Sequence, residues 1–166
     1  MVVLGIVKIP EKMYEKLKGA AEVQGMPVEG YVLSLIAESA DPSNLAESYW
    51  EASECLLRQA KDELARGDLR QAGEKAWGAV ALALKSLAYK REGLRLTSHG
   101  ELWEYVSKLA EETGDKELGR LWRSANSMHT NFYEGWADKE NVEEAIKDAE
   151  NFIRKLEKLI QPLDTS

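Results

Sequence analysis

Residues 67–88, "GDLRQAGEKAWGAVALALKSLA", decide the fold class of this protein. Asp68 is a typical N-cap residue, because its side chain can accept a hydrogen bond from a free backbone N–H of the first helical turn. From Ala76 to Ala88 the stretch is apolar on nearly every side, which is typical of a helix enclosed by other helices. Its small residues let those neighbours come close. The stretch therefore predicts an all-α protein in which this helix is enclosed by others.

The chain on either side of this helix, from residue 41 onward, also has helical periodicity interrupted by caps and stops. Ser98 with Glu101 has the pattern of a capping box, and Pro162 is expected to end the last helix. The predicted helices cover residues 41–67, 68–93, 98–114, 115–132 and 139–162. Their short connections favour antiparallel neighbours, so we expect an up-down antiparallel helical bundle.

The first 40 residues have a different pattern. "LGIVKIP", residues 4–10, is a short β-branched run that predicts a strand. Pro10 and Pro27 each stand where a helix can begin, and Gly25 separates the two helices. This order of strand, helix, turn and helix resembles the ribbon-helix-helix family, in which two chains pair their strands. We therefore predict a dimerisation segment over residues 1–40 and a helical bundle over residues 41–166.

Composition excludes several classes of protein. A net charge of −7 and 44% hydrophobic residues are typical of a soluble globular chain, and argue against strong nonspecific binding to nucleic acid. No apolar run reaches the roughly 20 residues that cross a bilayer, and the N-terminus lacks the features of a signal peptide. A cytoplasmic protein without membrane contact is expected. One cysteine, Cys55, excludes an intrachain disulfide, and with two histidines supplies too few ligands for zinc.

The stretch "RSANSMHTNFYEGW", residues 123–136, holds the candidate site. Successive helical residues turn by about 100°, which places Arg123, Asn126, His129 and Tyr133 on one flank of a helix. His129 lies where this flank meets the apolar face, so its imidazole is partly desolvated, which favours the neutral form. Arg123 and His129 are about 9 Å apart along the axis. They would therefore contact different parts of one ligand, or meet across a two-fold axis.

This Arg-x5-His spacing on a late helix of a bundle resembles the HEPN superfamily. There the motif of both protomers lines a cleft at the dimer interface, and many members are metal-independent ribonucleases. Residues 45–160, above all "EKAWGA" and "NFYEGW", are more closely similar to the archaeal PaREP family within the HEPN-like fold. The resemblance implies a homodimer that acts on RNA or a nucleotide, or that pairs with a nucleotidyltransferase-type protein.

The same resemblance implies roles for the residues of the flank. His129 would be the general acid or base and Arg123 the phosphate ligand, with Asn126 and Tyr133 in support. Neither a metal nor a cofactor is needed. His99, beside the capping serine, would reach the same cleft. Lys85, the lone cation of the apolar helix, either extends its ammonium group to the surface or projects into the cleft opposite Glu134.

Two alternatives to a ribonuclease stay open. One is a non-catalytic dimeric helical interaction module, with its interface at the helices that hold Trp77 and Trp122. The other is a DNA-binding regulator that uses residues 1–40. Ribbon-helix-helix repressors present polar or basic strand residues to the major groove, and only Lys8 meets that description here.

Overall fold

The computed structural model describes residues 4–164, with side chains for residues 4–161. The helices are α1 (Glu11–Val23), α2 (Val28–Ala40), a 3-10 helix (Pro42–Asn44), α3 (Leu45–Arg66), α4 (Leu69–Glu92), α5 (His99–Thr113), α6 (Glu117–Glu134) and α7 (Lys139–Asp164). No strand occurs in the described part of the chain, so the prediction of an all-α protein is confirmed.

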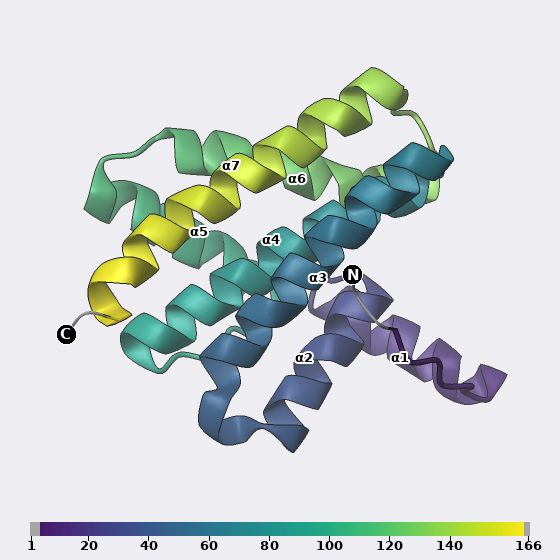
Figure 1. The fold of residues 1–166 in the computed structure, drawn as a ribbon, viewed down its shortest axis with the longest axis horizontal. Coiled ribbons are helices and arrows are strands. Elements are labelled where there is room, and N and C mark those ends of the chain that lie inside the picture. The colour runs from purple at the N-terminus through teal and green to yellow at the C-terminus, as the bar shows by residue number, and fades with distance from the viewer. Residues whose placement is uncertain (1–3, 165–166) are drawn as a thin grey trace.

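α3, α4, α6 and α7 form a bundle in which the chain reverses between α3 and α4 and again between α6 and α7 (Figure 1). α4 contacts α2, α3, α5, α6 and α7 and is therefore the central helix. Every residue of α4 from Ala72 to Ala88 is buried except Lys75. The mostly apolar character of this stretch is explained by this position, since an exposed face would have to be hydrated.

Local signals set most helix ends. The Asp68 side chain accepts a 3.1 Å hydrogen bond from the backbone N–H of Gln71, and Ser98 and Glu101 form the predicted capping box. α7 differs from the prediction, because it continues past Pro162 to Asp164. A proline removes one N–H and therefore one helical hydrogen bond, which a helix tolerates more easily in its last turn than in its interior.

The predicted N-terminal strand is wrong. Residues 4–10 adopt no regular structure, and Ile6 and Val7 are 91% and 83% exposed. A strand needs a partner for its backbone N–H and C=O groups, and the described residues of one chain offer none. The ribbon that a DNA-binding regulator would insert into the major groove is thus missing from residues 4–164. Residues 1–3 lie outside the described residues.

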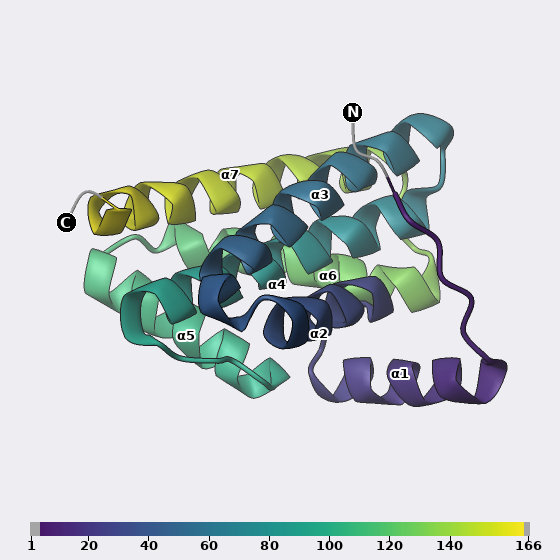
Figure 2. The ribbon, with the colours of Figure 1, turned by 60° about the horizontal axis from the view of Figure 1, so that its bottom comes forward.

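The bundle holds α2 closely. A Cβ atom built on Gly30 would lie 3.7 Å from Cα of Gly78, so the backbones of α2 and α4 approach each other at these two glycines. Trp77 Nε1 donates a 2.8 Å hydrogen bond to the carbonyl of Gly25, and Met26 is buried in the core. α1 projects from the bundle beside α2 (Figure 2). The division at residue 41 stays a prediction, but residues 26–40 share the core of the bundle.

Aromatic rings fill the centre of the protein. Trp77 and Trp122 are both 0% exposed, with ring centroids 4.7 Å apart, and Trp122 also contacts Phe152. Both rings face the core and are not available to a partner, so the predicted interface at the helices that hold them would have to use other side chains and stays a prediction. None of the described helices combines the length and the apolar character needed to cross a bilayer.

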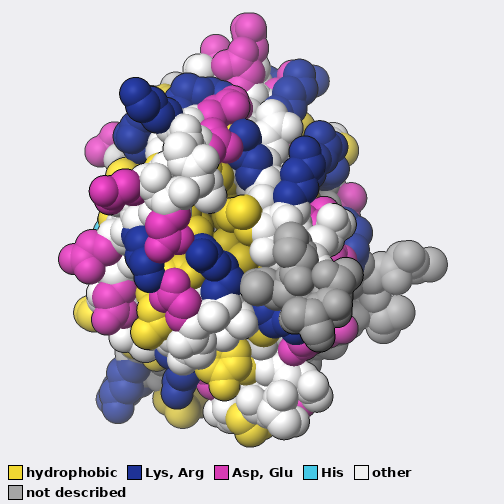
Figure 3. All heavy atoms as spheres, turned by 90° about the vertical axis from the view of Figure 1, so that its left-hand side faces the viewer, with side chains coloured by type: hydrophobic (Ala, Val, Ile, Leu, Met, Phe, Trp, Pro, Cys, Tyr) yellow, Lys and Arg dark blue, Asp and Glu magenta, His cyan; other side chains and the backbone are white. Residues whose placement is uncertain are grey.

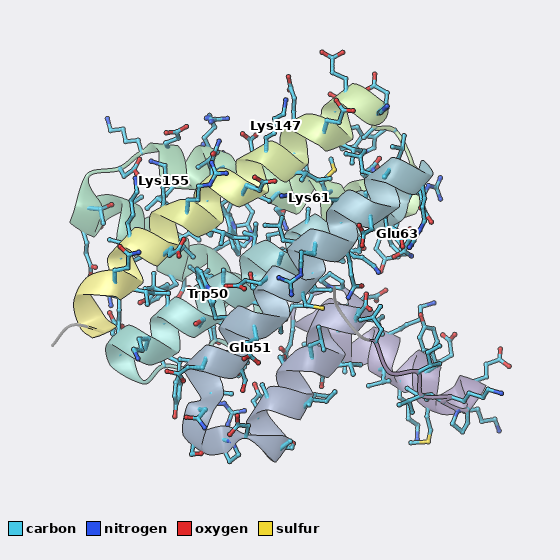
Figure 4. All side chains as sticks on the ribbon, in the orientation of Figure 1. Trp50, Glu51, Lys61, Glu63, Lys147 and Lys155 are labelled. Atoms are coloured by element: carbon cyan, nitrogen blue, oxygen red, sulfur yellow. The ribbon has the colours of Figure 1, made fainter. Side chains whose placement is uncertain are left out.

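Ion pairs on the surface link helices that the core already holds together. Lys61 of α3 lies 2.7 Å from Glu150 of α7, and Lys155 of α7 lies 2.7 Å from Asp115 before α6 (Figure 4). Exposed pairs of this kind contribute about 1 kcal/mol or less each. Burial of the apolar helix faces is thus the main source of stability.

Candidate functional site

A buried carboxylate orients the histidine of the predicted site. Nδ1 of His129, on α6, lies 2.7 Å from Oε1 of Glu74, on α4. The side chain of Glu74 is 7% exposed and that of His129 is 18% exposed, as the border position on the helix predicts. With Glu74 ionised, Nδ1 carries the proton and donates to the carboxylate, which leaves Nε2 as the acceptor nitrogen. Nε2 makes no hydrogen bond within the described residues.

Burial makes the ionised form of Glu74 costly for the stability of the fold. Burial raises the pKa of its carboxyl above the usual value of 4.5, and the hydrogen bond to His129 partly opposes this rise. A raised pKa means that folding favours the protonated carboxyl. The protonated carboxyl stabilises the fold fully below pH 4.5, and this stabilisation is lost as the pH rises through the raised pKa of the folded protein.

Glu74→Gln is therefore expected to gain stability relative to the wild type as the pH rises from 4.5 toward 8. The amide keeps an oxygen for the Nδ1 proton of His129 but cannot ionise. Urea denaturation at pH 4, 6 and 8 measures the difference in free energy of unfolding. Glu111→Gln, at an exposed position of α5, is the control and should show no such trend. A difference that is independent of pH would contradict this account of the buried carboxyl.

Tyr133 lies against His129 as the helical spacing predicts. The two ring centroids are 5.7 Å apart with the rings edge to face. Burial raises the pKa of the Tyr133 hydroxyl, and the carboxylates of Glu74 and Glu22 raise it further. Since Glu22 belongs to α1, the N-terminal segment reaches the edge of the site.

His99 is near the site but is held by packing. It begins α5, and its Nε2 accepts a 2.8 Å hydrogen bond from Nε1 of Trp103. Burial lowers the pKa of His99, and the charge of a protonated His129 lowers it further. Its ring also packs on Gly25, where φ is +66° and an added side chain would collide with the imidazole. His99 is thus a neutral acceptor that joins α5 to the α1–α2 turn.

Arg123 does not meet His129 within one chain. Its side chain is exposed, and Nη1 lies 3.2 Å from the position that a Cβ atom on Gly119 would take. The guanidinium therefore folds back along α6, away from His129. Asn126, between the two, is half-buried and makes no side-chain hydrogen bond with the described residues. A cleft shared by two protomers stays a prediction.

Lys85 lies far from this cluster. It is eleven residues beyond the buried glutamate on α4, or about 16 Å along the axis. Its Nζ is buried, 3.4 Å from Oγ of Ser34, 4.0 Å from a carboxylate oxygen of Glu38 and 5.3 Å from the ring centroid of Tyr49. Both expected positions, at the surface and opposite Glu134, are wrong. α2 covers the lysine, and the sequence does not reveal this packing.

The free energy of unfolding of Lys85→Met at pH 7 is expected to equal or exceed that of the wild type. Burial lowers the pKa of Lys85, so folding disfavours its charged form. When the ammonium is removed, Glu38 still accepts a 2.6 Å hydrogen bond from the hydroxyl of Tyr49. It also keeps its ion pair with Arg95, at 3.0 Å. The advantage should shrink as the pH approaches 10.5, where the unfolded lysine also loses its proton.

The matched variant Lys85→Ala leaves a cavity in place of the side chain. It should lower the free energy of unfolding by about 2 kcal/mol or more. Urea denaturation of both variants at pH 7 and 10 is the measurement. If methionine is as destabilising as alanine, the ammonium group itself stabilises the fold and this interpretation is wrong.

A surface cavity of about 300 Å³ lies elsewhere, between α3, α4 and α7. Trp50 and Glu51 of α3 line it (Figure 4). Lys90 of α4 and Ile160 of α7 complete this lining. One end of the molecule shows acidic and basic side chains interspersed around small apolar patches, without a field of one sign (Figure 3). No predicted site residue lines this cavity.

The sequence did not identify Glu74 as a site residue. It stands just before the apolar run and falls on the same side of α4 as Gly78, Ala81 and Lys85, at spacings of four, three and four residues. An acid on a stripe that is otherwise apolar up to Lys85 was the available signal. Its partner His129 is 55 residues away in the chain, so only the packing of α4 on α6 pairs them.

Comparison with known proteins agrees with the family predicted from the sequence. The family described as "Archaeal PaREP1/PaREP8 family" matches residues 48–153, which include α4, α5 and α6 and exclude α1 and α2. A crystal structure of a Sulfolobus solfataricus protein is similar in fold, with a TM-score of 0.57 and 23% identity over 63% of this chain and 92% of that one. Curated proteins gave no match. The chain belongs to the archaeal PaREP1/PaREP8 family.

Proposed function

We propose that this protein is a metal-independent ribonuclease in which His129, oriented by Glu74, is the general base. The single observation that carries the proposal is the 2.7 Å contact between Nδ1 of His129 and the buried carboxylate. Such a carboxylate holds the imidazole in one tautomer and one orientation, and it stabilises the imidazolium that forms when Nε2 takes a proton. The position of His129 on a late helix of a bundle, which resembles the place of the histidine in the HEPN superfamily, supports the same reaction.

The reaction needs no metal, because the substrate supplies its own nucleophile. Nε2 of His129 takes the proton of a ribose 2′-hydroxyl, and the 2′-oxygen attacks the adjacent phosphorus. The bond from phosphorus to the 5′-oxygen breaks, that oxygen takes a proton from water as it leaves, and His129 afterwards returns its proton to the solvent. The products are a 2′,3′-cyclic phosphate and a 5′-hydroxyl end. A base with a reference pKa near 6.5 suits this transfer at neutral pH.

A pair of matched oligonucleotides tests the proposal. The purified protein is incubated in EDTA with an RNA and with the same sequence lacking every 2′-hydroxyl. We expect cleavage of the RNA only, with cyclic phosphate ends that resist ligation at the 3′-hydroxyl until the cyclic phosphate has been opened and the phosphate removed. Intact RNA, or equal cleavage of the deoxy substrate, would show that the proposal is wrong.

A second candidate function is a dimeric interaction module, which the exposed N-terminal segment favours. Leu4, Ile6, Val7 and Met13 are 60%, 91%, 83% and 59% exposed. Several exposed apolar side chains within one short segment are a surface that a partner could cover. A second copy of the chain is the expected partner, and a nucleotidyltransferase-type protein is the alternative that the HEPN resemblance implies. Light scattering of the wild type against Ile6→Asp tests the homodimer, since a wild-type monomer at micromolar concentration would exclude it.

A further inference from the structure

We infer that Arg70, and not Arg123, is the phosphate ligand beside His129, so that one chain carries the whole site. This inference rests on the proposed ribonuclease function and assigns its anion-binding group to α4. It also removes the need for a partner chain in the cleavage step.

Arg70 lies next to Glu74 on the same side of α4. The two residues are four apart, which separates them by about 40° around the helix and about 6 Å along it. α4 and α6 run antiparallel where they meet: Glu74 contacts His129, and the guanidinium of Arg70 lies against Gly135 at the end of α6. The Cα of Arg70 is therefore displaced from Glu74 by one turn of α4, and its guanidinium lies beside a residue six positions, or about 9 Å, beyond His129 along α6.

Tyr133 connects the two positions on α6. It follows His129 by one turn, with its ring edge-on to the imidazole at 5.7 Å, and it precedes Gly135 by two residues. The imidazole of His129, the phenol of Tyr133 and the guanidinium of Arg70 thus lie in this order toward the C-terminal end of α6. A phosphodiester held by Arg70 would place the neighbouring ribose toward His129.

The charge of Arg70 is available to a ligand. Its side chain is exposed, and within residues 4–164 it forms no ion pair with a carboxylate. The buried carboxylate of the site is already engaged, because Glu74 contacts His129. The C-terminal end of α6 carries a partial negative charge that attracts the guanidinium without neutralising it. A planar guanidinium binds phosphate oxygens in pairs, which positions as well as attracts the substrate.

Gly135 makes room for this arrangement. Its φ is +67°, a left-handed conformation that ends α6, and any side chain there would overlap the Arg70 guanidinium. Arg123 offers no such placement, because its guanidinium folds back toward Gly119 at the other end of α6.

Steady-state cleavage of a short RNA by the full chain separates the two arginines. Arg70→Ala should lower kcat/KM by 100-fold or more, Arg70→Lys should recover about tenfold of that loss, and Arg123→Ala should stay within threefold of the wild type. Thermal unfolding of each variant is the control. If Arg70 only caps α6, Arg70→Ala should lower the melting temperature and leave the activity of the folded protein unchanged.

Mixing inactive variants tests whether the site lies in one chain. Arg70→Ala mixed with His129→Ala should remain inactive, because neither chain has a complete site. Activity restored by mixing, or an active Arg70→Ala beside an inactive Arg123→Ala, would overturn the inference and favour a cleft between two chains. An inactive wild type would instead overturn the proposed function itself.

Discussion

His129→Ala is expected to lower the rate of RNA cleavage by about 10²- to 10⁴-fold, the range that a general acid or base contributes. The residue is the one imidazole in the structure with a buried carboxylate on Nδ1 and an unbonded Nε2, as far as the described residues show. Initial rates in EDTA at pH 7 give the measurement. Thr130→Ala, at the next and exposed position of α6, is the matched control and should cleave at the wild-type rate.

The role of Glu74 follows from the same assay. Because it acts through His129, Glu74→Gln should lower the rate by roughly 10- to 100-fold, and the double variant should be no slower than His129→Ala alone. Losses that multiply in the double variant would mean that the two residues act independently. A cleavage rate unaffected by His129→Ala would assign any activity to another part of the protein.

Trp77→Ala should produce the largest loss of stability, about 3–5 kcal/mol in the free energy of unfolding. The indole is fully buried at the centre of the bundle, and its Nε1 is 2.8 Å from the carbonyl of Gly25. Truncation therefore leaves a large cavity and frees the turn between α1 and α2. Urea denaturation gives the free energy, and amide hydrogen exchange should accelerate at residues 24–26.

Two further variants separate packing from hydrogen bonding at this position. Trp77→Phe keeps much of the aromatic contact and loses the hydrogen bond to Gly25. Losing that bond should lower the free energy of unfolding by about 1 kcal/mol, and the smaller ring adds a lesser loss of packing. Trp136→Ala, at a tryptophan that is 51% exposed, should change stability by about 0.5 kcal/mol or less. If Trp77→Ala were no worse than Trp136→Ala, the tight packing around α4 described above would be wrong.

Both predictions depend on α4, which serves the core and the candidate site together. Trp77 faces the aromatic centre, whereas Glu74, three residues earlier, leaves the core to meet His129. A polar group on a helix this buried needs a partner, because an unpaired charge there would be strongly unfavourable. Stability and the proposed activity are therefore linked through one helix.

The helices and most of their ends were predictable because their causes are local. Asp68 bonds to the backbone N–H three residues later, and Ser98 and Glu101 bond across one turn. The strand over residues 4–10 was mispredicted for the opposite reason. A β-branched run becomes a strand only when a second strand supplies hydrogen bonds, and residues 4–164 of one chain supply none.

The candidate site was also predictable only where local helical periodicity decides the arrangement. Helical periodicity alone put His129 and Tyr133 on one flank, and their rings are in contact. The same periodicity put Arg123 on that flank without showing that its guanidinium folds back toward Gly119. Spacing determines where a Cα atom lies on a helix. It does not determine the direction of a long side chain.

By itself, the sequence determined an all-helical protein of the PaREP1/PaREP8 family, with a helix enclosed from Ala76 to Ala88 and an imidazole at the border of the apolar face of α6. Only the tertiary structure decided that Glu74 faces that imidazole, that Lys85 is buried under α2, and that Arg70 lies at the end of α6. The physical reason is the range of the interactions. Helix formation and capping act within about four residues, whereas these contacts join residues more than 50 positions apart and exist only after the helices have packed.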